Sequence, residues 1–212
     1  MKISSRPDRP FDAVLCDVDN VIRFYDSGPL AELERAAGLA EGSTARVAFA
    51  PEVDLPLMRG EIGLGQWVES IVAGFAGRVP RERARELGRA LADSPFRADA
   101  EIVALLRRVR AAGVPLVLVT NATVRLEDDL AEMGLTGLAD HVVSSARLGV
   151  VKPDRKIYEI AASLVDASFD RCLFVDDTEE NVEAALALGM TGVVYRELAD
   201  LKAALGAHPA LS

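Results

Sequence analysis

The amino-acid sequence predicts an α/β fold, an open parallel sheet with a helical insertion, and two patterns support this prediction. Along residues 94–212, short apolar runs alternate with amphipathic helical patterns, which is typical of a parallel sheet with helical crossovers. Residues 13–16 form one further apolar run, and mainly helical patterns separate it from the next strand. We therefore expect a core domain of residues 1–26 and 94–212, with a helical domain of residues 27–93 inserted after its first strand.

The elements of the core follow from the spacing of apolar residues. Residues 115–119 are almost continuously aliphatic, as in a strand that is buried on both faces of a parallel sheet. Residues 99–112 carry apolar side chains at helical spacing. Strands are expected at residues 13–16, 115–119, 141–144, 172–175 and 191–195. Helices are expected at residues 99–112, 124–133, 154–165, 178–188 and 198–205.

Helix signals dominate the inserted domain. Ser27-Gly28-Pro29 predicts a helix start, since proline is favoured in the first helical turn, and Gly38 predicts the end of that helix. Residues 51–65 contain two prolines and three glycines, which predicts mainly loop. Helices are expected at residues 30–37, 43–50, 66–75 and 81–91.

Composition narrows the classes of protein that fit. The 212 residues are 50% hydrophobic and 27% charged, which is enough apolar material for a packed core and excludes a disordered chain. The formal charge of −9 argues against partners that need a concentrated basic face, namely nucleic acids and anionic membrane surfaces. Of the 24 basic residues, only Lys2, Lys152, Lys156 and Lys202 are lysines, so each lysine is of interest.

A cytoplasmic location is expected for this chain. Residues 1–10 are polar and contain no apolar stretch of signal-peptide length. The longest aliphatic run, residues 114–119, is too short to cross a bilayer. Cys16 and Cys172 lie in apolar runs without metal-type spacing, so we expect two buried, reduced thiols.

Polar residues stand at the carboxyl ends of the predicted strands, where open α/β sheets bind ligands. The first strand delivers Asp17 and Asp19, the second Thr120 and Asn121, the segment after the third Lys152, and the fourth Asp176 and Asp177. We expect these side chains to converge on one crevice. Four carboxylates cannot all stay ionised there without a counter-charge, and hard oxygen ligands favour Mg²⁺.

This set of side chains suits phosphate chemistry. A magnesium site beside a lysine and a threonine fits an anionic oxygen ligand, most simply a phosphate. Asp17 is then a candidate nucleophile that forms an aspartyl phosphate, and Asp19 is a candidate general acid. Thr120 can donate a hydrogen bond to a phosphoryl oxygen, and Lys152 can neutralise both the nucleophile and the phosphate.

The chain resembles the haloacid dehalogenase superfamily of phosphohydrolases in four motifs. The motifs are Asp17-Val18-Asp19-Asn20-Val21, then Val119-Thr120-Asn121, then Val151-Lys152-Pro153-Asp154 with Ile157-Tyr158, and finally Phe174-Val175-Asp176-Asp177 with Asn181-Val182. The resemblance extends from about residue 11 to residue 195. It implies a Rossmann-like core sheet and a mobile helical cap formed by the insertion.

The resemblance implies a role for each matched acid. Asp17 would be the nucleophile and a magnesium ligand, and Asp19 the general acid and base that binds the ion through its backbone carbonyl. Asp177 would ligate magnesium directly, with Asp176 ligating or supporting it. The dehalogenases of the family lack a carboxylate at the position of Asp19, so Asp19 favours phosphoryl transfer. Asn20 replaces the glycine of many relatives, and asparagine tolerates a left-handed turn.

The function expected from the sequence is magnesium-dependent hydrolysis of a small phosphorylated metabolite through a phospho-Asp17 intermediate. Thr120, Asn121 and Lys152 are expected to bind the substrate, and Arg59 to contact it from the insertion. The alternatives are a phosphomutase or another hydrolase of the same family on the same site, a receiver-like phosphoacceptor and a catalytically silent phosphate-binding protein. In receivers the acidic pair precedes the lysine in the chain, whereas here Asp176-Asp177 comes last. Substrate identity and oligomeric state stay open.

Overall fold

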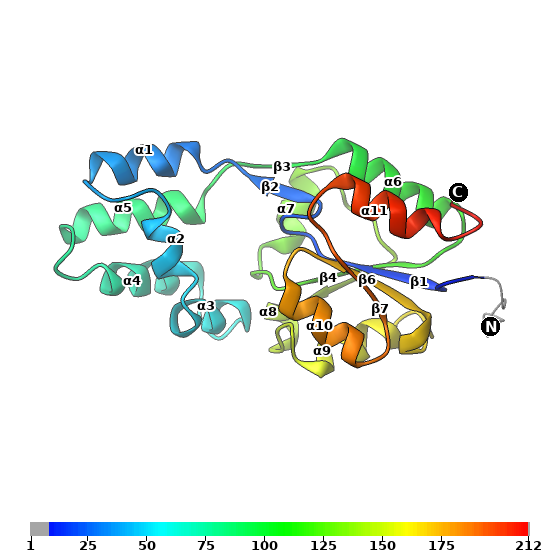
Figure 1. The fold of residues 1–212 in the computed structure, drawn as a ribbon. Helices are drawn as coiled ribbons and strands as arrows, with labels where there is room; N and C mark the ends of the chain where they lie inside the picture. Colours follow the sequence, from blue (N-terminus) through cyan, green and yellow to red (C-terminus); the bar gives the residue numbers. More distant parts are fainter. Residues whose placement is uncertain (1–8, 212) are drawn as a thin grey trace. The chain divides into compact units, whose positions relative to one another are not determined.

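A computed structural model describes residues 9–211, which form two compact units (Figure 1). The first unit comprises Met1–Phe24 and Ala98–Ser212, and the second comprises Tyr25–Arg97. The polar start of the chain, residues 1–8, lies outside the described residues. The domain boundaries expected from the sequence were residues 26/27 and 93/94. Each unit is described separately below.

The chain passes between the two units through a pair of short strands. They are β2 (Arg23–Tyr25) and β3 (Phe96–Ala98), which pair as a two-stranded sheet. The ring of Tyr25 packs edge-on against the ring of Phe96, with 5.9 Å between the centroids. Neither strand was predicted from the sequence, because three residues are too few to show a period of two.

The α/β unit is built on a five-stranded parallel sheet, which confirms the predicted fold class. The strand order is β5-β4-β1-β6-β7, so β1 is central and pairs with β4 on one side and β6 on the other. The strands are β1 (Ala13–Cys16), β4 (Leu116–Thr120), β5 (His141–Ser144), β6 (Cys172–Asp176) and β7 (Thr191–Val194). Because all the pairs are parallel, the carboxyl ends of β1, β4 and β6 lie at the same edge.

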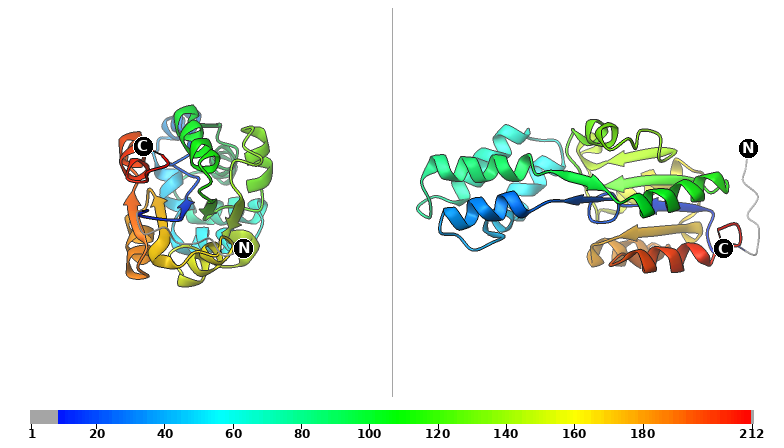
Figure 2. Two further views of the ribbon diagram at one scale, coloured as in Figure 1. Left: turned by 90° about the vertical axis from the view of Figure 1, so that its right-hand side faces the viewer. Right: turned by 90° about the horizontal axis from the view of Figure 1, so that it is seen from above.

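Both faces of this sheet are buried, because side chains of a strand alternate between its faces. Val14 and Cys16 of β1 belong to one apolar cluster, with residues of α6, α7 and α11, whereas Ala13 and Leu15 belong to another, with residues of α9 and α10. The helices α6 and α11 lie on one face, and α9 and α10 on the opposite face (Figure 1 and Figure 2). This double burial explains the uninterrupted apolar runs in the sequence.

The helices of the α/β unit begin and end near the predicted residues. They are α6 (Ala100–Ala111), α7 (Leu126–Glu132), α9 (Arg155–Ser163), α10 (Glu179–Ala187) and α11 (Leu198–Gly206). Two short elements were not predicted, α8 (Ser145–Leu148) and the 3₁₀ helix η1 (Phe169–Arg171). Within residues 9–211, every helix is too short or too polar to cross a membrane.

Cys16 and Cys172 are both buried and free, as the sequence predicted. Burial raises the pKa of Cys16 and raises the pKa of Cys172 to about 12, so both stay protonated thiols. They act as small apolar side chains of the sheet.

The second unit is entirely helical apart from its ends. Its helices are α1 (Gly28–Ala36), α2 (Ser43–Ala48), α3 (Pro51–Met58), α4 (Leu64–Gly74) and α5 (Arg81–Ala92). The core contains Trp67, Ile71 and Phe75 at helical spacing along α4 and its end. Gly74 allows a close approach, because a Cβ on it would lie 2.4 Å from Cγ1 of Val47.

The expectation of mainly loop over residues 51–65 is wrong for its first half, which forms α3. Pro51 stands in the first turn, where its missing N–H has no partner in any helix. Pro56 removes one internal hydrogen bond of a helix that is only eight residues long. Burial of Leu57 in the apolar core favours the helix despite that loss.

The carboxylate of Asp54, in the helical unit, lies in buried surroundings that disfavour its charged form. We therefore expect Asp54→Asn to stabilise the protein at pH 8. Oδ1 of Asp54 is buried and has no hydrogen-bond partner among the described residues, and burial raises the pKa of Asp54 from 3.8 to about 6. The folded state therefore holds this proton to a higher pH than the unfolded state, and stability falls as the pH rises through 6.

The full shift would correspond to about 3 kcal/mol, and partial exposure reduces the expected gain of Asp54→Asn to about 1 kcal/mol at pH 8. At pH 4 the two proteins should unfold at nearly the same urea concentration. Glu52→Gln, in the same helical turn but exposed, is the matched control and should bring no gain at either pH. Urea unfolding that shows Asp54→Asn to be destabilising at pH 8 would contradict the prediction.

Candidate active site

The carboxyl edge of the sheet gathers most of the residues that the sequence singled out. Asp17 follows β1 directly, Thr120 is the last residue of β4, and Asp176 is the last residue of β6. The backbone N–H of Asp17 donates to the carbonyl of Val175 over 2.9 Å, which extends the β1–β6 pairing to the first catalytic candidate. Parallel pairing thus brings together side chains that are more than 150 residues apart in the chain.

Lys152 is buried between two of the acids. Its Nζ lies 2.9 Å from Oδ1 of Asp17 and 2.6 Å from Oδ2 of Asp176, and only 1% of the side chain is exposed. Asn121 holds this lysine from the backbone, since its Oδ1 accepts from Lys152 N over 2.8 Å and its Nδ2 donates to Lys152 O over 3.0 Å. The amide of Asn121 therefore supports Lys152, and its predicted contact with a substrate stays a prediction.

Three carboxylates form a cluster of the kind that holds a cation. Asp17, Asp176 and Asp177 each present an oxygen within 4.8 Å of the others. Asp176 is oriented by the backbone N–H of Thr178 over 2.9 Å and by Nδ2 of Asn181 over 3.1 Å. Hydrogen-bonded, hard oxygen ligands of this kind fit Mg²⁺.

Asn20 completes one side of the cluster. Its Nδ2 donates to Oδ2 of Asp177 over 2.9 Å, so the turn after β1 is tied to the turn after β6. The backbone of Asn20 has a φ of 58°, the left-handed region that asparagine tolerates. A glycine here would supply the turn without this hydrogen bond.

The charges of the cluster are not balanced by Lys152 alone. Burial raises the pKa of Asp17 to about 7, with a further contribution from Asp176, while Lys152 opposes the rise. Burial by itself would lower the pKa of Lys152, but the two carboxylates outweigh it and hold the ammonium charged. A divalent cation would supply the missing positive charge and keep Asp17 ionised at neutral pH.

Thr120 carries a hydroxyl that is available to a ligand. The residue is fully buried, and its Oγ1 has no hydrogen-bond partner in the described part of the chain. An unpaired buried hydroxyl is costly unless a further group fills its hydrogen-bonding capacity. A phosphoryl oxygen beside Asp17 and Lys152 would do so.

Asp19 lies outside the three-acid cluster, and its carboxylate is held by Arg23. Nε of Arg23 lies 2.5 Å from Oδ1 of Asp19, and Nη1 lies 2.6 Å from Oδ2 of Asp129. Neither Arg23 nor Asp129 was among the residues predicted for the site. The sequence did contain a signal for Arg23, its position four residues after Asp19, but one arginine among twenty is not distinctive.

Arg59, the candidate in the helical unit, is exposed at the C-terminal end of α3, and its contact with a substrate stays a prediction.

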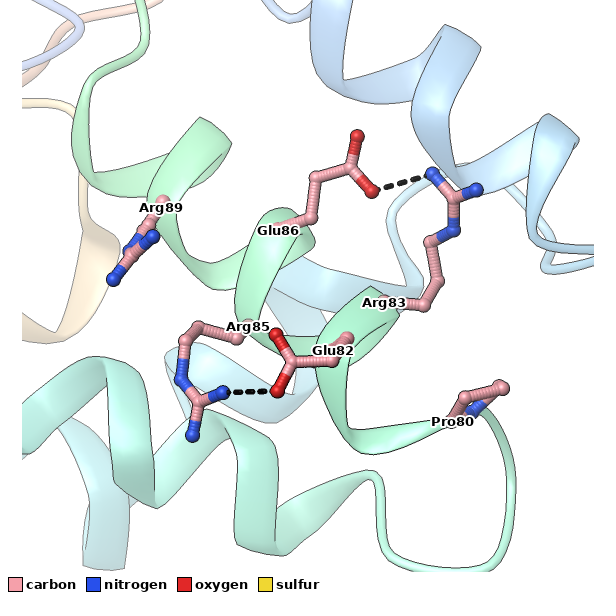
Figure 3. Close-up of a pocket in the computed structure, with 6 residues that line it drawn as sticks. All are labelled: Pro80, Glu82, Arg83, Arg85, Glu86 and Arg89. Atoms are coloured by element: carbon pink, nitrogen blue, oxygen red, sulfur yellow. Dashed lines mark hydrogen bonds and ion pairs between the residues drawn. The ribbon is translucent and has the colours of Figure 1, made fainter.

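A surface pocket of the same unit is drawn in Figure 3. It is lined by Pro80, Glu82, Arg83, Arg85, Glu86 and Arg89. Arg83 pairs with Glu86 at 2.5 Å and Arg85 with Glu82 at 2.8 Å, as the dashed lines in Figure 3 show. These are ordinary exposed ion pairs along α5, and they suggest no chemistry.

Fold and site together define a hydrolase of the haloacid dehalogenase-like class. Residues 11–189 match the family model of the haloacid dehalogenase-like hydrolases. Because this match covers most of the chain, the protein belongs to that family and is an enzyme. The resemblance inferred from the four motifs is thereby confirmed.

Curated relatives include two phosphatases and a dehalogenase. A sesquiterpene phosphatase of Aspergillus oryzae is 39% identical over 99 residues, which cover 46% of this chain and 50% of the relative. An (S)-2-haloacid dehalogenase of Pseudomonas putida is 30% identical over 125 residues, 54% of each chain. A phosphatase of Mycobacterium tuberculosis is 29% identical over 188 residues, 73% of this chain and 86% of the relative. The chain thus spans about half the length of the first two relatives.

The fold is also found among solved structures. A haloacid dehalogenase family enzyme of Bacteroides thetaiotaomicron, solved in complex with magnesium and inorganic phosphate, has a TM-score of 0.67 and 15% sequence identity. The match covers 90% of this chain and 98% of that chain. At this identity the likeness shows the fold, and it confirms the Rossmann-like core.

Proposed function

We propose that this hydrolase is a magnesium-dependent phosphatase that acts on a small phosphorylated metabolite through an aspartyl phosphate on Asp17. The observation that carries the proposal is the placement of Lys152 between Asp17 and Asp176, at 2.9 and 2.6 Å, beside the third acid Asp177. This arrangement offers a nucleophilic carboxylate, a fixed positive charge and a set of oxygen ligands at one point.

In the first half of the reaction, a carboxylate oxygen of Asp17 attacks the phosphorus, and the bond from phosphorus to the leaving oxygen breaks. Asp19, protonated, gives its proton to that oxygen, so the product leaves as a neutral alcohol. In the second half, Asp19 as a carboxylate takes a proton from water. The oxygen of that water attacks the phosphorus, and Asp17 leaves with its electron pair, which releases inorganic phosphate.

The other site residues stabilise charge during these steps. Lys152 faces the attacking oxygen, and the free hydroxyl of Thr120 can donate to a phosphoryl oxygen. Asp17, Asp176, Asp177 and the backbone carbonyl of Asp19 would hold Mg²⁺, whose charge offsets the carboxylates and the phosphate.

A dehalogenase is the alternative that one relative favours, and Asp19 argues against it. A halide leaves as a stable anion and needs no proton, whereas an alcohol leaves readily only when it is protonated. A phosphomutase would use the same residues and return the phosphate to the substrate. Two of the relatives are phosphatases, which supports hydrolysis. Hydrolysis is also the simpler reaction, because it does not require the phosphate to return to the substrate.

The helical unit is the natural candidate for a cap that selects the substrate. It is inserted between the first and second strands of the sheet, and we assign Arg59 to recognition of an anionic part of the substrate. We also assign the protein to the cytoplasm, since Cys16 and Cys172 are free thiols.

Removal of the metal tests this proposal. With p-nitrophenyl phosphate at pH 7.5, we expect hydrolysis in Mg²⁺ and a fall of about 100-fold or more in excess chelator, because Lys152 alone does not balance the carboxylates and the phosphate. Addition of Mg²⁺ should restore the rate, and Ca²⁺, which is larger and takes more ligands, should not. A rate that is unchanged by the chelator would overturn the proposal.

A panel of substrates separates the alternatives. Release of inorganic phosphate from several metabolite phosphates supports the phosphatase. Transfer of the phosphate within a sugar phosphate, without release, would indicate a phosphomutase. Release of halide from 2-chloropropionate, without hydrolysis of any phosphate, would indicate a dehalogenase.

A further inference from the structure

A buried arginine grips the carboxylate of Asp19 with two hydrogen bonds. Nε of Arg23 donates to Oδ1 over 2.5 Å, and Nη2 donates to Oδ2 over 3.0 Å, so both oxygens are engaged by the planar guanidinium. The side chain of Arg23 is only 3% exposed, whereas that of Asp19 is 29% exposed. The guanidinium therefore contacts Asp19 from the protein interior, and part of the Asp19 side chain stays exposed.

The backbone around this pair forms a closed turn. The N–H groups of Ile22 and Arg23 both donate to the carbonyl of Val18 over 2.8 Å, and Asn20 N donates to the carbonyl of Arg23 over 2.9 Å. Asp19 and Arg23 also form an isolated β-bridge. Main chain and side chains together fix residues 19 and 23 against each other.

A second carboxylate anchors the other side of the guanidinium. Nη1 of Arg23 donates to Oδ2 of Asp129 over 2.6 Å, and the side chain of Asp129 is 13% exposed. Asp129 belongs to α7 and lies 106 residues after Arg23 in the chain. Burying an arginine is expensive, and two carboxylates compensate it here with good geometry.

We propose that Arg23, anchored by Asp129, is the positioning residue of Asp19 and holds its carboxylate in the orientation required for proton transfer. The inference rests on the proposed function, in which Asp19 is the acid and base. Without the guanidinium, the partly exposed carboxylate could occupy several rotamers, and only some of them would face the leaving oxygen. Arg23 should then increase the rate most for substrates whose leaving group is basic, because such a group needs the proton from Asp19.

Two aryl phosphates that differ in the basicity of the leaving group test this role. p-Nitrophenyl phosphate has a leaving group that departs without much help, whereas phenyl phosphate has a more basic one that needs the proton. For Arg23→Gln we expect kcat/KM to fall about 10-fold or more with phenyl phosphate and less than about 3-fold with p-nitrophenyl phosphate. The selectivity ratio is kcat/KM with phenyl phosphate divided by kcat/KM with p-nitrophenyl phosphate. Asp19→Asn should lower this ratio at least as much as Arg23→Gln does. In the Asp19→Asn variant, adding Arg23→Gln should lower the ratio no further.

A matched control separates positioning from stability. Arg171 likewise donates two hydrogen bonds to the carboxylate of Asp12, over 2.9 and 3.0 Å. This pair lies in the same unit, but Asp12 directly precedes β1 and Arg171 directly precedes β6. Arg171→Gln should leave the selectivity ratio unchanged. Equal losses of Arg23→Gln on both substrates would overturn the proposal, because a merely structural role lowers both.

A milder variant keeps the test open if Arg23→Gln fails to fold. Asp129→Asn preserves the shape of the anchor and leaves Arg23 paired with Asp19, so it should lower the selectivity ratio in the same direction by about 3-fold. A folded Asp129→Asn with an unchanged ratio would then count against the proposal. If the wild type hydrolyses neither aryl phosphate, the proposed function fails first, and this inference fails with it.

Discussion

Asp17→Asn is expected to lower the turnover of p-nitrophenyl phosphate by about 10⁴-fold or more. The amide presents a neutral oxygen in place of the carboxylate, so it cannot form the phosphoenzyme, and nucleophile replacements of this kind cause losses of that order. The carboxylate also belongs to the cluster that would hold the metal. Both effects lower the rate, and steady-state kinetics in saturating Mg²⁺ measure their sum.

The variant should nevertheless fold. Burial raises the pKa of Asp17 to about 7, so at pH 8 the ionised carboxylate is unfavourable for the folded state. A neutral amide removes that cost, and Lys152 keeps its contact of 2.6 Å with Asp176. We expect the melting temperature at pH 8 to stay within about 5 °C of the wild type. Asp128→Asn, exposed on α7, is the matched control and should change neither property.

Mass spectrometry identifies the phosphorylated residue. Asp19→Asn, which keeps the nucleophile and removes the base for the second half of the reaction, should accumulate phosphate on the peptide that contains Asp17. Asp17→Asn should show no phosphate on that peptide. Phosphate on another residue, or full turnover by Asp17→Asn, would exclude the proposed mechanism.

The sheet and the acids at its edge were predictable because short stretches of sequence determine them. β1, β4 and β6 each contain a run of four buried apolar residues, and the first polar side chain of the site follows each run. The order of Asp17, Thr120, Lys152 and Asp176 along the chain then follows the strands to one edge. Lys152 was visible in the sequence because lysine is scarce, with four residues in the chain.

The roles of Arg23 and Asp129 were not predictable, because no short stretch of sequence determines their contact. Their contact joins residues 106 apart, and arginine is the common basic residue of this chain. Nothing local distinguishes a buried arginine from an exposed one until the path of the backbone is known. Residues 51–58 show the same limit, because burial of Leu57 outweighs the local signal of two prolines.

Lys152→Met should affect both catalysis and stability, because this lysine is the positive charge at the centre of the site. Its Nζ contacts Asp17 and Asp176, and the side chains of all three are at most 8% exposed. Methionine has similar length and no charge, so the variant leaves two carboxylates buried without their partner. Loss of one member of a buried ion pair costs about 3–5 kcal/mol, and we expect a loss of this size in urea unfolding at pH 8 without metal.

The pH dependence of this loss has a definite sign. Without the ammonium, the pKa of Asp17 in the folded state rises further above that of an unfolded aspartate, so the folded variant binds a proton more readily than the unfolded one. Its stability should therefore improve relative to the wild type as the pH falls from 8 to 5, where protonation can neutralise Asp17. A destabilisation that grows toward pH 5 would contradict this account of the site.

Lys156→Met provides the comparison within the same chain. Lys156 lies four residues further on, its side chain is 62% exposed, and its Nζ lies 3.8 Å from Oε2 of Glu159. We expect this variant to keep the wild-type unfolding curve and the wild-type rate, whereas Lys152→Met should lose at least about 100-fold in kcat/KM on p-nitrophenyl phosphate. Mg²⁺ can offset part of the charge that Lys152→Met removes from the fold, but it cannot replace an ammonium that faces the attacking oxygen. The variant should accordingly regain some stability in saturating Mg²⁺ without regaining its rate, and recovery of both would mean that Lys152 serves the fold alone.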